Sequence, residues 1–84
     1  MGGILDPAVA FGKVLRLLRS EVGLTQEQLG FEADLRRTYV SILELGQQQP
    51  SLTTILKLAK ALNCTAAELM EKVETEIGRV KRRK

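Results

Sequence analysis

Apolar residues recur three and four positions apart along most of the chain, which is the period of an α-helix and not of a β-strand. Asp6 and Pro7 predict the start of a first helix, because aspartate caps the free N–H groups of a first turn and proline fits its first position. Gly23 predicts the end of this helix, because glycine adopts the left-handed conformation that closes helices. The apolar side of the helix comprises Phe11, Val14, Leu15, Leu18 and Val22.

Two short helices are predicted next, at 26–33 and 36–44. The first opens on a capping box, in which Thr25 caps the first turn and Gln28 reaches back to the backbone N–H of Thr25. The second has one apolar and one polar side. The stretch 25–44 therefore has the pattern of a helix-turn-helix motif, whose second helix fits the major groove of DNA.

Two further helices complete the pattern after Gly46. Ser51 caps the fourth, and Thr65 with Glu68 forms a second capping box that opens the fifth. Cys64 precedes this cap at an apolar position, so we expect a small buried hydrophobic residue rather than a redox site. The predicted buried faces are Ile55, Leu58, Ala59 and Leu62 in the fourth helix and Ala66, Leu69, Met70, Val73 and Ile77 in the fifth.

The predicted fold class is therefore all-α, a compact domain of five helices over residues 7–78. Residues 1–6 are expected to be disordered, and residues 79–84 to form a basic tail. The net charge of +3 arises from this tail, since five of the thirteen basic residues lie in its six positions. The tail is either a solvated terminus or an arm that binds phosphates, and the acidic remainder of the chain gives no argument for nucleic acid.

Catalytic and metal chemistry find no support in the sequence. There is no histidine and Cys64 is the only cysteine, so neither an internal disulfide nor a zinc site with Cys/His ligands can form. We therefore expect no enzyme activity, no cofactor, no metal and no small-molecule ligand. No apolar run approaches the ~20 residues that span a bilayer, and the start of the chain does not resemble a signal peptide, which predicts a soluble, cytoplasmic protein.

The polar side of the second motif helix carries the candidate base-reading residues. Its amino-terminal end favours phosphate, and an arginine there can also bind guanine with two hydrogen bonds. Ile42 lies on this side as well, where it either contacts a thymine methyl group or packs in the core. The candidate base-reading residues are Arg36, Arg37, Thr38, Ser41 and Ile42.

Candidate phosphate-binding residues flank this helix. Gln26 begins the first motif helix and can offer its side-chain amide and its backbone N–H to a phosphate. Tyr39 can pack its ring and still reach the DNA backbone with its hydroxyl. Gln47, Gln48 and Gln49 follow as uncharged donors in a loop, where they either touch sugar and phosphate or are only solvated.

The apolar stripe of the fifth helix is longer than a small core needs. It either packs on the first helix or forms a contact with another chain. We expect a homodimer interface, because dimeric helix-turn-helix proteins bind paired half-sites. The predicted interface residues are Leu69, Met70, Val73 and Ile77.

Taken together, four segments resemble the Cro/phage-repressor type of helix-turn-helix domain, also called the xenobiotic-response-element family. They are LRxxxGLTQEQLG, RRTYVSILELG, QPSLTTILKLAKAL and AAEL, and the match spans Leu15 to Leu69. The resemblance implies a lambda-repressor-like fold and places the family's base-reading and phosphate-binding residues on the candidates above. The sequence RTYVS with the loop and SLTT also resembles controller proteins of restriction–modification systems.

Three residues depart from the family pattern. Gly30 stands where the family usually has alanine, at a cost in helix propensity of up to ~1 kcal/mol. Asp34 replaces the usual glycine of the turn, although aspartate tolerates the left-handed conformation. Arg36 replaces the usual capping residue, so the second motif helix lacks an N-cap unless Asp34 serves.

The sequence thus predicts a transcriptional regulator that binds an inverted-repeat operator in double-stranded DNA as a homodimer. Its expected location is the cytoplasm of a bacterium or phage-infected cell, at the nucleoid. The alternative is a protein-interaction module, such as the antitoxin of a toxin–antitoxin pair, which the acidic fifth helix and its apolar stripe suggest.

Overall fold

The computed structural model describes residues 6–82, with side chains to Arg79, and this part of the chain is helical without strands. The predicted all-α fold with five helices is confirmed. No helix of the described part is long and apolar enough to cross a membrane. The helices are α1 (Pro7–Glu21), α2 (Gln26–Ala33), α3 (Arg37–Glu44), α4 (Leu52–Ala61) and α5 (Ala66–Arg82).

Three predicted boundaries need correction. Asp6 is not part of a disordered start, because its Oδ1 accepts a hydrogen bond from the Ala8 backbone N–H at 2.9 Å and caps α1. Helix α3 begins at Arg37, and Arg36 is its N-cap residue. Helix α5 continues through Arg82, so most of the predicted tail extends this helix. The remainder of the predicted disordered start and of the tail lies outside the described residues.

Side-chain caps determine where α2 and α5 begin. In the predicted capping box of α2, the Gln28 backbone N–H donates to Thr25 Oγ1 at 3.0 Å, and the Thr25 N–H donates to Gln28 Oε1 at 2.8 Å. Thr65 and Glu68 form the same pair of bonds at α5. These reciprocal bonds satisfy backbone donors that have no partner within the helix.

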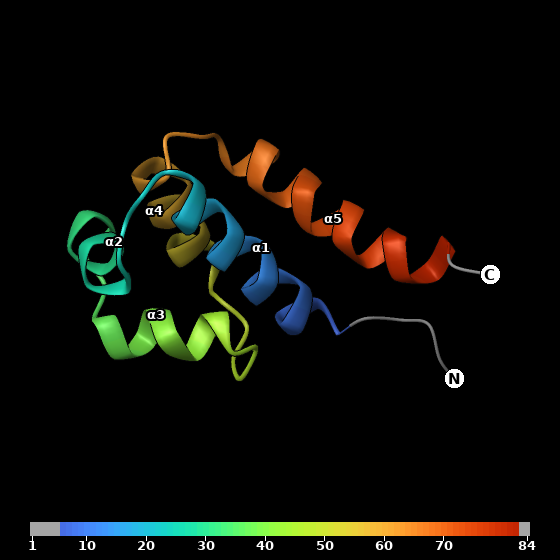
Figure 1. Cartoon of the computed structure of the whole chain (residues 1–84), viewed down its shortest axis with the longest axis horizontal. Coiled ribbons are helices and arrows are strands. Elements are labelled where there is room, and N and C mark those ends of the chain that lie inside the picture. Colours follow the sequence, from blue (N-terminus) through green and yellow to red (C-terminus); the bar gives the residue numbers. More distant parts are fainter. Residues whose placement is uncertain (1–5, 83–84) are drawn as a thin grey trace.

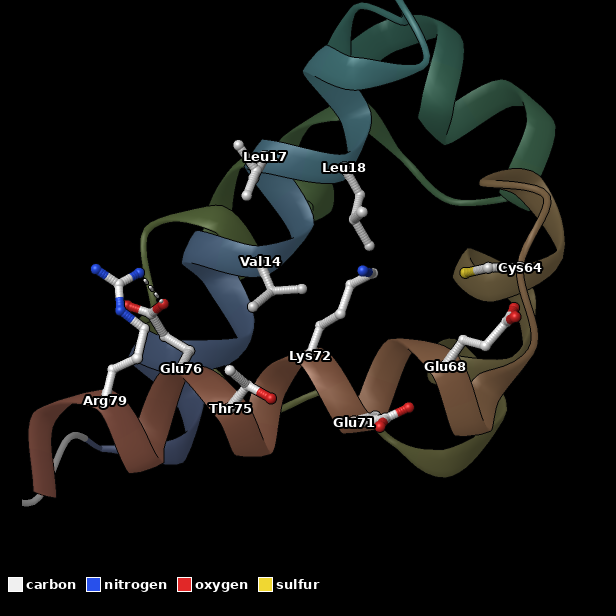
Figure 2. A pocket seen from close by; sticks show the side chains of 10 residues that line it. All are labelled: Val14, Leu17, Leu18, Cys64, Glu68, Glu71, Lys72, Thr75, Glu76 and Arg79. Atoms are coloured by element: carbon white, nitrogen blue, oxygen red, sulfur yellow. Dashed lines mark hydrogen bonds and ion pairs between the residues drawn. The ribbon is translucent and has the colours of Figure 1, made fainter. Parts of the chain in front are cut away.

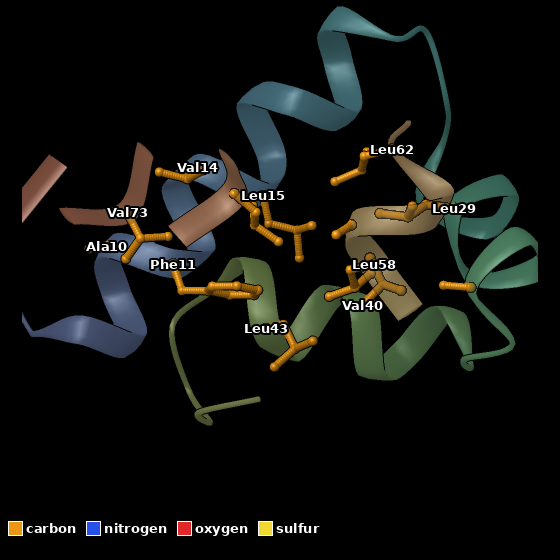
Figure 3. Packing of buried hydrophobic residues seen from close by; sticks show 13 residues of the cluster. Ala10, Phe11, Val14, Leu15, Leu29, Val40, Leu43, Leu58, Leu62 and Val73 are labelled. Carbon is orange, nitrogen blue, oxygen red and sulfur yellow. The ribbon is translucent and has the colours of Figure 1, made fainter. Parts of the chain in front are cut away.

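Helix α1 lies at the centre of the molecule, with α3 along one side and α5 along the other (Figure 1). Helix α2 packs against α3 and α4, and α4 also packs against α5. The core between them consists of aliphatic side chains and the ring of Phe11, and every helix contributes to it (Figure 3). The largest of its fully buried members are Leu15, Leu29, Val40, Leu43, Leu58 and Leu69.

Two glycines bring α1 unusually close to the end of α3. A Cβ atom on Gly12 would lie 2.5 Å from the Leu43 carbonyl oxygen, and one on Gly46 would lie 2.9 Å from Val9 Cα. Gly46 also has a φ of +74°, a conformation that other residues rarely adopt. Because both contacts involve backbone atoms, any larger side chain at Gly12 would push α1 away from α3.

Cys64 is only half-buried, which corrects the expectation of a fully buried residue. Its side chain lies at one end of a groove of about 670 Å³ between α1 and α5 (Figure 2). Burial raises the pKa of the Cys64 thiol, and the nearby Glu68 carboxylate raises it further. The thiol therefore stays protonated at neutral pH, in agreement with a packing role rather than a reactive one.

Candidate DNA-binding surface

One face of helix α3 packs into the core, and the opposite face is exposed. Val40 and Leu43 are fully buried on the inner face. Arg37 and Thr38 are exposed at the amino-terminal end, and Ser41 is partly exposed one turn further. A helix anchored in this way presents its polar side chains from a fixed backbone, as reading of DNA bases requires.

The turn before α3 is set by Gly30 and Asp34. Asp34 adopts the left-handed conformation, with φ 58° and ψ 48°, as its side chain allows. The Leu35 backbone N–H then donates to the Gly30 carbonyl at 2.7 Å, which folds the chain back over the end of α2. A Cβ atom on Gly30 would lie only 2.6 Å from the Leu35 carbonyl oxygen. The absence of alanine at position 30 thus has a steric reason in this turn.

The amino-terminal end of α3 has no side-chain cap. Asp34 does not substitute for a cap, since its exposed carboxylate lies 3.7 Å from the Lys57 ammonium group. The Tyr39 and Val40 N–H groups bond to the Arg36 carbonyl. At the first two helical positions, a backbone N–H has no acceptor within the helix. Those of Arg37 and Thr38 therefore face outward beside two arginine side chains, which favours binding of an anion such as a phosphate.

A hydrogen-bonded ion pair fixes the other end of α3. Arg19 on α1 donates through Nε to Glu44 Oε2 at 2.6 Å and through Nη2 to Oε1 at 3.1 Å. Its Nη1 donates to the Leu24 carbonyl at 2.9 Å. The two side chains are 15% and 4% exposed, and their hydrogen bond raises the pKa of Arg19 above its ordinary value. This pair connects α1, the start of the motif and the last turn of α3.

The sequence interpretation missed the roles of Arg19 and Glu44, although a signal for them exists. Glu44 lies four residues after the buried Val40, which places a carboxylate on the apolar side of the helix. Arg19 likewise lies four residues after Leu15. A charge in an apolar stripe is expected to have a partner, and two such charges of opposite sign suggest each other.

Gln26 belongs to the same network, which changes its predicted role. Its Nε2 atom donates to Glu44 Oε1 at 3.0 Å, so the amide is partly used within the protein. This bond uses one of the two amide N–H groups of Gln26. The other amide N–H and the backbone N–H of Gln26, at the first position of α2, remain available to an outside acceptor. Any phosphate contact by Gln26 therefore relies on these two donors and on an orientation that Glu44 fixes.

The remaining candidate residues lie around α3. Tyr39 is half-buried and packs against the core, and Ile42 is partly exposed. The Gln47 N–H donates to the Ile42 carbonyl at 3.1 Å, so the loop starts close to the last turn of α3. All three loop glutamines, Gln47, Gln48 and Gln49, are exposed.

The predicted dimer stripe on α5 requires a correction. Leu69 is fully buried and Val73 is 3% exposed within the single chain, because α5 packs on α1 and α4. Ile77 packs partly against the same core, and Met70 is 36% exposed. The length of the stripe thus reflects packing on α1, and it offers another chain little apolar surface beyond Met70.

Two short helices joined by a tight turn, with the second anchored in the core and its polar side free, define a helix-turn-helix DNA-binding domain. The chain belongs to the helix-turn-helix family, whose model matches residues 15–69. The members of this family regulate transcription and are not enzymes.

Relatives and solved structures agree with this assignment. The chain is 40% identical to control protein C.BamHI of Bacillus amyloliquefaciens over 75 residues, which cover 88% of this chain and 90% of the relative. The controller protein C.AhdI from Aeromonas hydrophila matches with 50% identity and a TM-score of 0.72, over 74% of this chain and 94% of that one. The tetramer of controller protein C.Esp1396I in complex with its 35 base-pair operator matches with 26% identity and a TM-score of 0.79, over 87% and 96%.

Proposed function

We propose that this protein is a transcriptional regulator that recognises an inverted-repeat operator as a homodimer, with one α3 helix of each copy in the major groove. The observation that carries the proposal is the uncapped, arginine-flanked start of α3, held on a backbone that the buried Val40 and Leu43 fix. Resemblance to controller proteins of restriction–modification systems, one of them solved as a tetramer on its operator, supports the same function.

Within this proposal, the side chains divide into two groups by what they reach. Arg36, Arg37, Thr38, Ser41 and Ile42 read base edges, since they follow the free face of α3 from its amino-terminal end. Gln26, Tyr39 and the glutamines 47–49 bind the phosphate backbone on either side. Phosphate contacts supply most of the affinity and position the helix, and base contacts supply the discrimination. The protein acts where bacterial DNA lies, in the cytoplasm at the nucleoid.

The competing reading, a protein-interaction module such as an antitoxin, loses its main argument. It rested on the acidic character of α5 and on its apolar stripe, and the core of the chain itself covers Leu69 and Val73 of that stripe.

Selection of bound duplexes from a random DNA pool at about 150 mM salt, near physiological ionic strength, tests the proposal. We expect enrichment of an inverted repeat whose half-sites lie about one helical turn, ~34 Å, apart. A pool that stays random after repeated rounds would show that contact with DNA is only electrostatic and would reject sequence-specific regulation.

A further inference from the structure

A large apolar side chain, that of Leu45, ends the exposed face of α3, where it is 65% exposed. Its backbone N–H donates to the Ser41 carbonyl at 3.0 Å, so the helical path of α3 continues through this residue. Leu45 follows the exposed Thr38 by seven residues, which is nearly two full turns, and the two side chains therefore point almost the same way. Val40 and Leu43 lie on the opposite side, in the core. The centre of the exposed face thus begins with a threonine and ends with a leucine.

The residues on either side of Leu45 hold it in this position. The Glu44 side chain is 4% exposed and forms the ion pair with Arg19 of α1. Gly46 lies so close to α1 that a Cβ atom on it would be 2.9 Å from Val9 Cα. Because both neighbours are attached to α1, the exposure of Leu45 is a property of the folded helix and not of a loose loop.

The chemistry around Leu45 does not suit a phosphate. Between Arg37 and Lys57 the only charged residue is Glu44, which is paired with Arg19. A leucine side chain has no hydrogen-bond donor, and contact with it would remove water from a phosphate without replacing the lost hydrogen bonds. The end of the exposed face therefore favours an apolar group as its contact.

The major groove of DNA presents one such group. Each base edge there offers donors and acceptors, and thymine adds the methyl group on C5. Seven helical residues span about 10 Å, and base pairs follow each other every ~3.4 Å. A helix that lies along the groove therefore places Leu45 about three base pairs from the base that Thr38 contacts.

We propose that Leu45 is a specificity-determining residue whose side chain packs on the C5-methyl group of a thymine, about three base pairs from the base at Thr38. This inference rests on the proposed function, because it requires α3 in the major groove. Leu45 selects thymine over cytosine, since cytosine offers at this edge an amino group that leucine cannot bind and has no methyl group. It therefore adds reading by apolar contact to the hydrogen bonds of the arginines.

Deoxyuridine tests this contact, because it differs from thymidine only by the absence of the methyl group. Each thymine of the selected operator is replaced in turn, and affinity is titrated for the unmodified protein and for Leu45→Ala. We expect one position in each half-site where the unmodified protein loses about four-fold, the value of one buried methyl-sized group, and Leu45→Ala loses nothing. Equal losses in the two proteins at every thymine would overturn the proposal.

Leu17→Ala is the matched control for this titration. It removes the same atoms from a leucine that is 58% exposed on α1, and it should lose the same four-fold as the unmodified protein. Far-ultraviolet circular dichroism and melting curves verify that both variants are folded. A Leu17→Ala protein that is as indifferent to the methyl group as Leu45→Ala would contradict a contact made by Leu45 itself.

A second measurement places the methyl group on a different base pair. At the position found with deoxyuridine, the thymine–adenine pair is replaced by cytosine–guanine and, separately, by 5-methylcytosine–guanine. We expect 5-methylcytosine to bind about four-fold more tightly than cytosine with the unmodified protein, and equally with Leu45→Ala. An advantage of the same size in both proteins would reject Leu45 as the residue that reads the methyl group.

The inference and the function can fail separately, because selection from the random pool precedes the removal of methyl groups. A pool that stays random rejects the regulator, and with it any reading by Leu45. An enriched inverted repeat on which Leu45→Ala responds to methyl removal as the unmodified protein does would support the regulator and reject the role of Leu45.

Discussion

The Nε atom of Arg19 lies 2.6 Å from Oε2 of Glu44, which joins α1 to the last turn of the helix proposed to enter the major groove. Glu44 also accepts from Gln26, the first residue of α2. One carboxylate therefore holds the relative positions of the three helices on which the DNA-binding surface depends. Rigidity of this kind lets side chains at the other end of α3 meet base edges with a constant geometry.

Replacing Arg19 by methionine should lower the free energy of unfolding by about 3 kcal/mol, because the Glu44 carboxylate would remain buried without its partner. Urea unfolding measures the effect. Arg79→Met is the matched control, since Arg79 pairs with Glu76 while 73% exposed and should matter by less than about 1 kcal/mol. Equal losses in the two variants would contradict a structural role for the Arg19–Glu44 pair.

The same pair predicts how alkali affects stability. The pKa of Arg19 is raised in the folded protein, so the folded state binds its proton more tightly than the unfolded state does. Its contribution is therefore complete at every pH below the ordinary arginine pKa and is lost progressively as the pH rises from there through the raised value. We expect Arg19→Met to lose the same free energy of unfolding at pH 7 and at pH 9. A loss that shrinks between these values would contradict the assignment.

Gly30→Ala should destabilise the protein although alanine favours helices. The added Cβ would lie 2.6 Å from the Leu35 carbonyl oxygen, and overpacking against backbone costs about 1–3 kcal/mol. Gly78→Ala is the control, because nothing lies within 4 Å of its Cβ position on α5. It should stabilise by about 0.5–1 kcal/mol from helix propensity alone. Thermal unfolding gives both values, and stabilisation by both substitutions would contradict the turn geometry.

Arg37→Ala should weaken binding to the selected operator by about 1–3 kcal/mol and relax the choice of base at one position of each half-site. Removal of a side chain that binds only phosphate would instead weaken all sequences alike. Arg16→Ala removes an exposed arginine from α1 and should leave affinity and discrimination unchanged. Titration of the operator and of single-base variants measures both quantities. Discrimination equal to that of the unmodified protein would exclude Arg37 from base reading.

The basic residues at the end of the chain lead to a prediction about salt. Replacing Lys81, Arg82, Arg83 and Lys84 with glutamine should reduce the slope of log affinity against log salt by about 0.9 for each phosphate that is no longer neutralised. The preferred sequence should not change, because phosphate contacts carry no base information. An unchanged slope would show that these side chains are only solvated.

The sequence by itself determined the helices and the location of the motif. Thr25 with Gln28, Ser51, and Thr65 with Glu68 start helices through bonds that span at most three residues, so local pattern suffices to find them. The free face of α3 was equally predictable, since Val40 and Leu43 point to the core and leave the residues between them outside. The left-handed conformation of Asp34 was also compatible with the sequence, because an aspartate side chain tolerates this conformation.

Only the tertiary structure decided which charges and which apolar stripes have partners. Arg19 and Glu44 are 25 residues apart, and the packing of α1 on α3 brings them together. The backbone contact that requires Gly12, and the coverage of Leu69 and Val73 by the core, depend on the same packing. An apolar stripe shows that a helix face will be covered. Whether the same chain or another copy covers it depends on the distances between helices in the folded protein, which the spacing of apolar residues does not give.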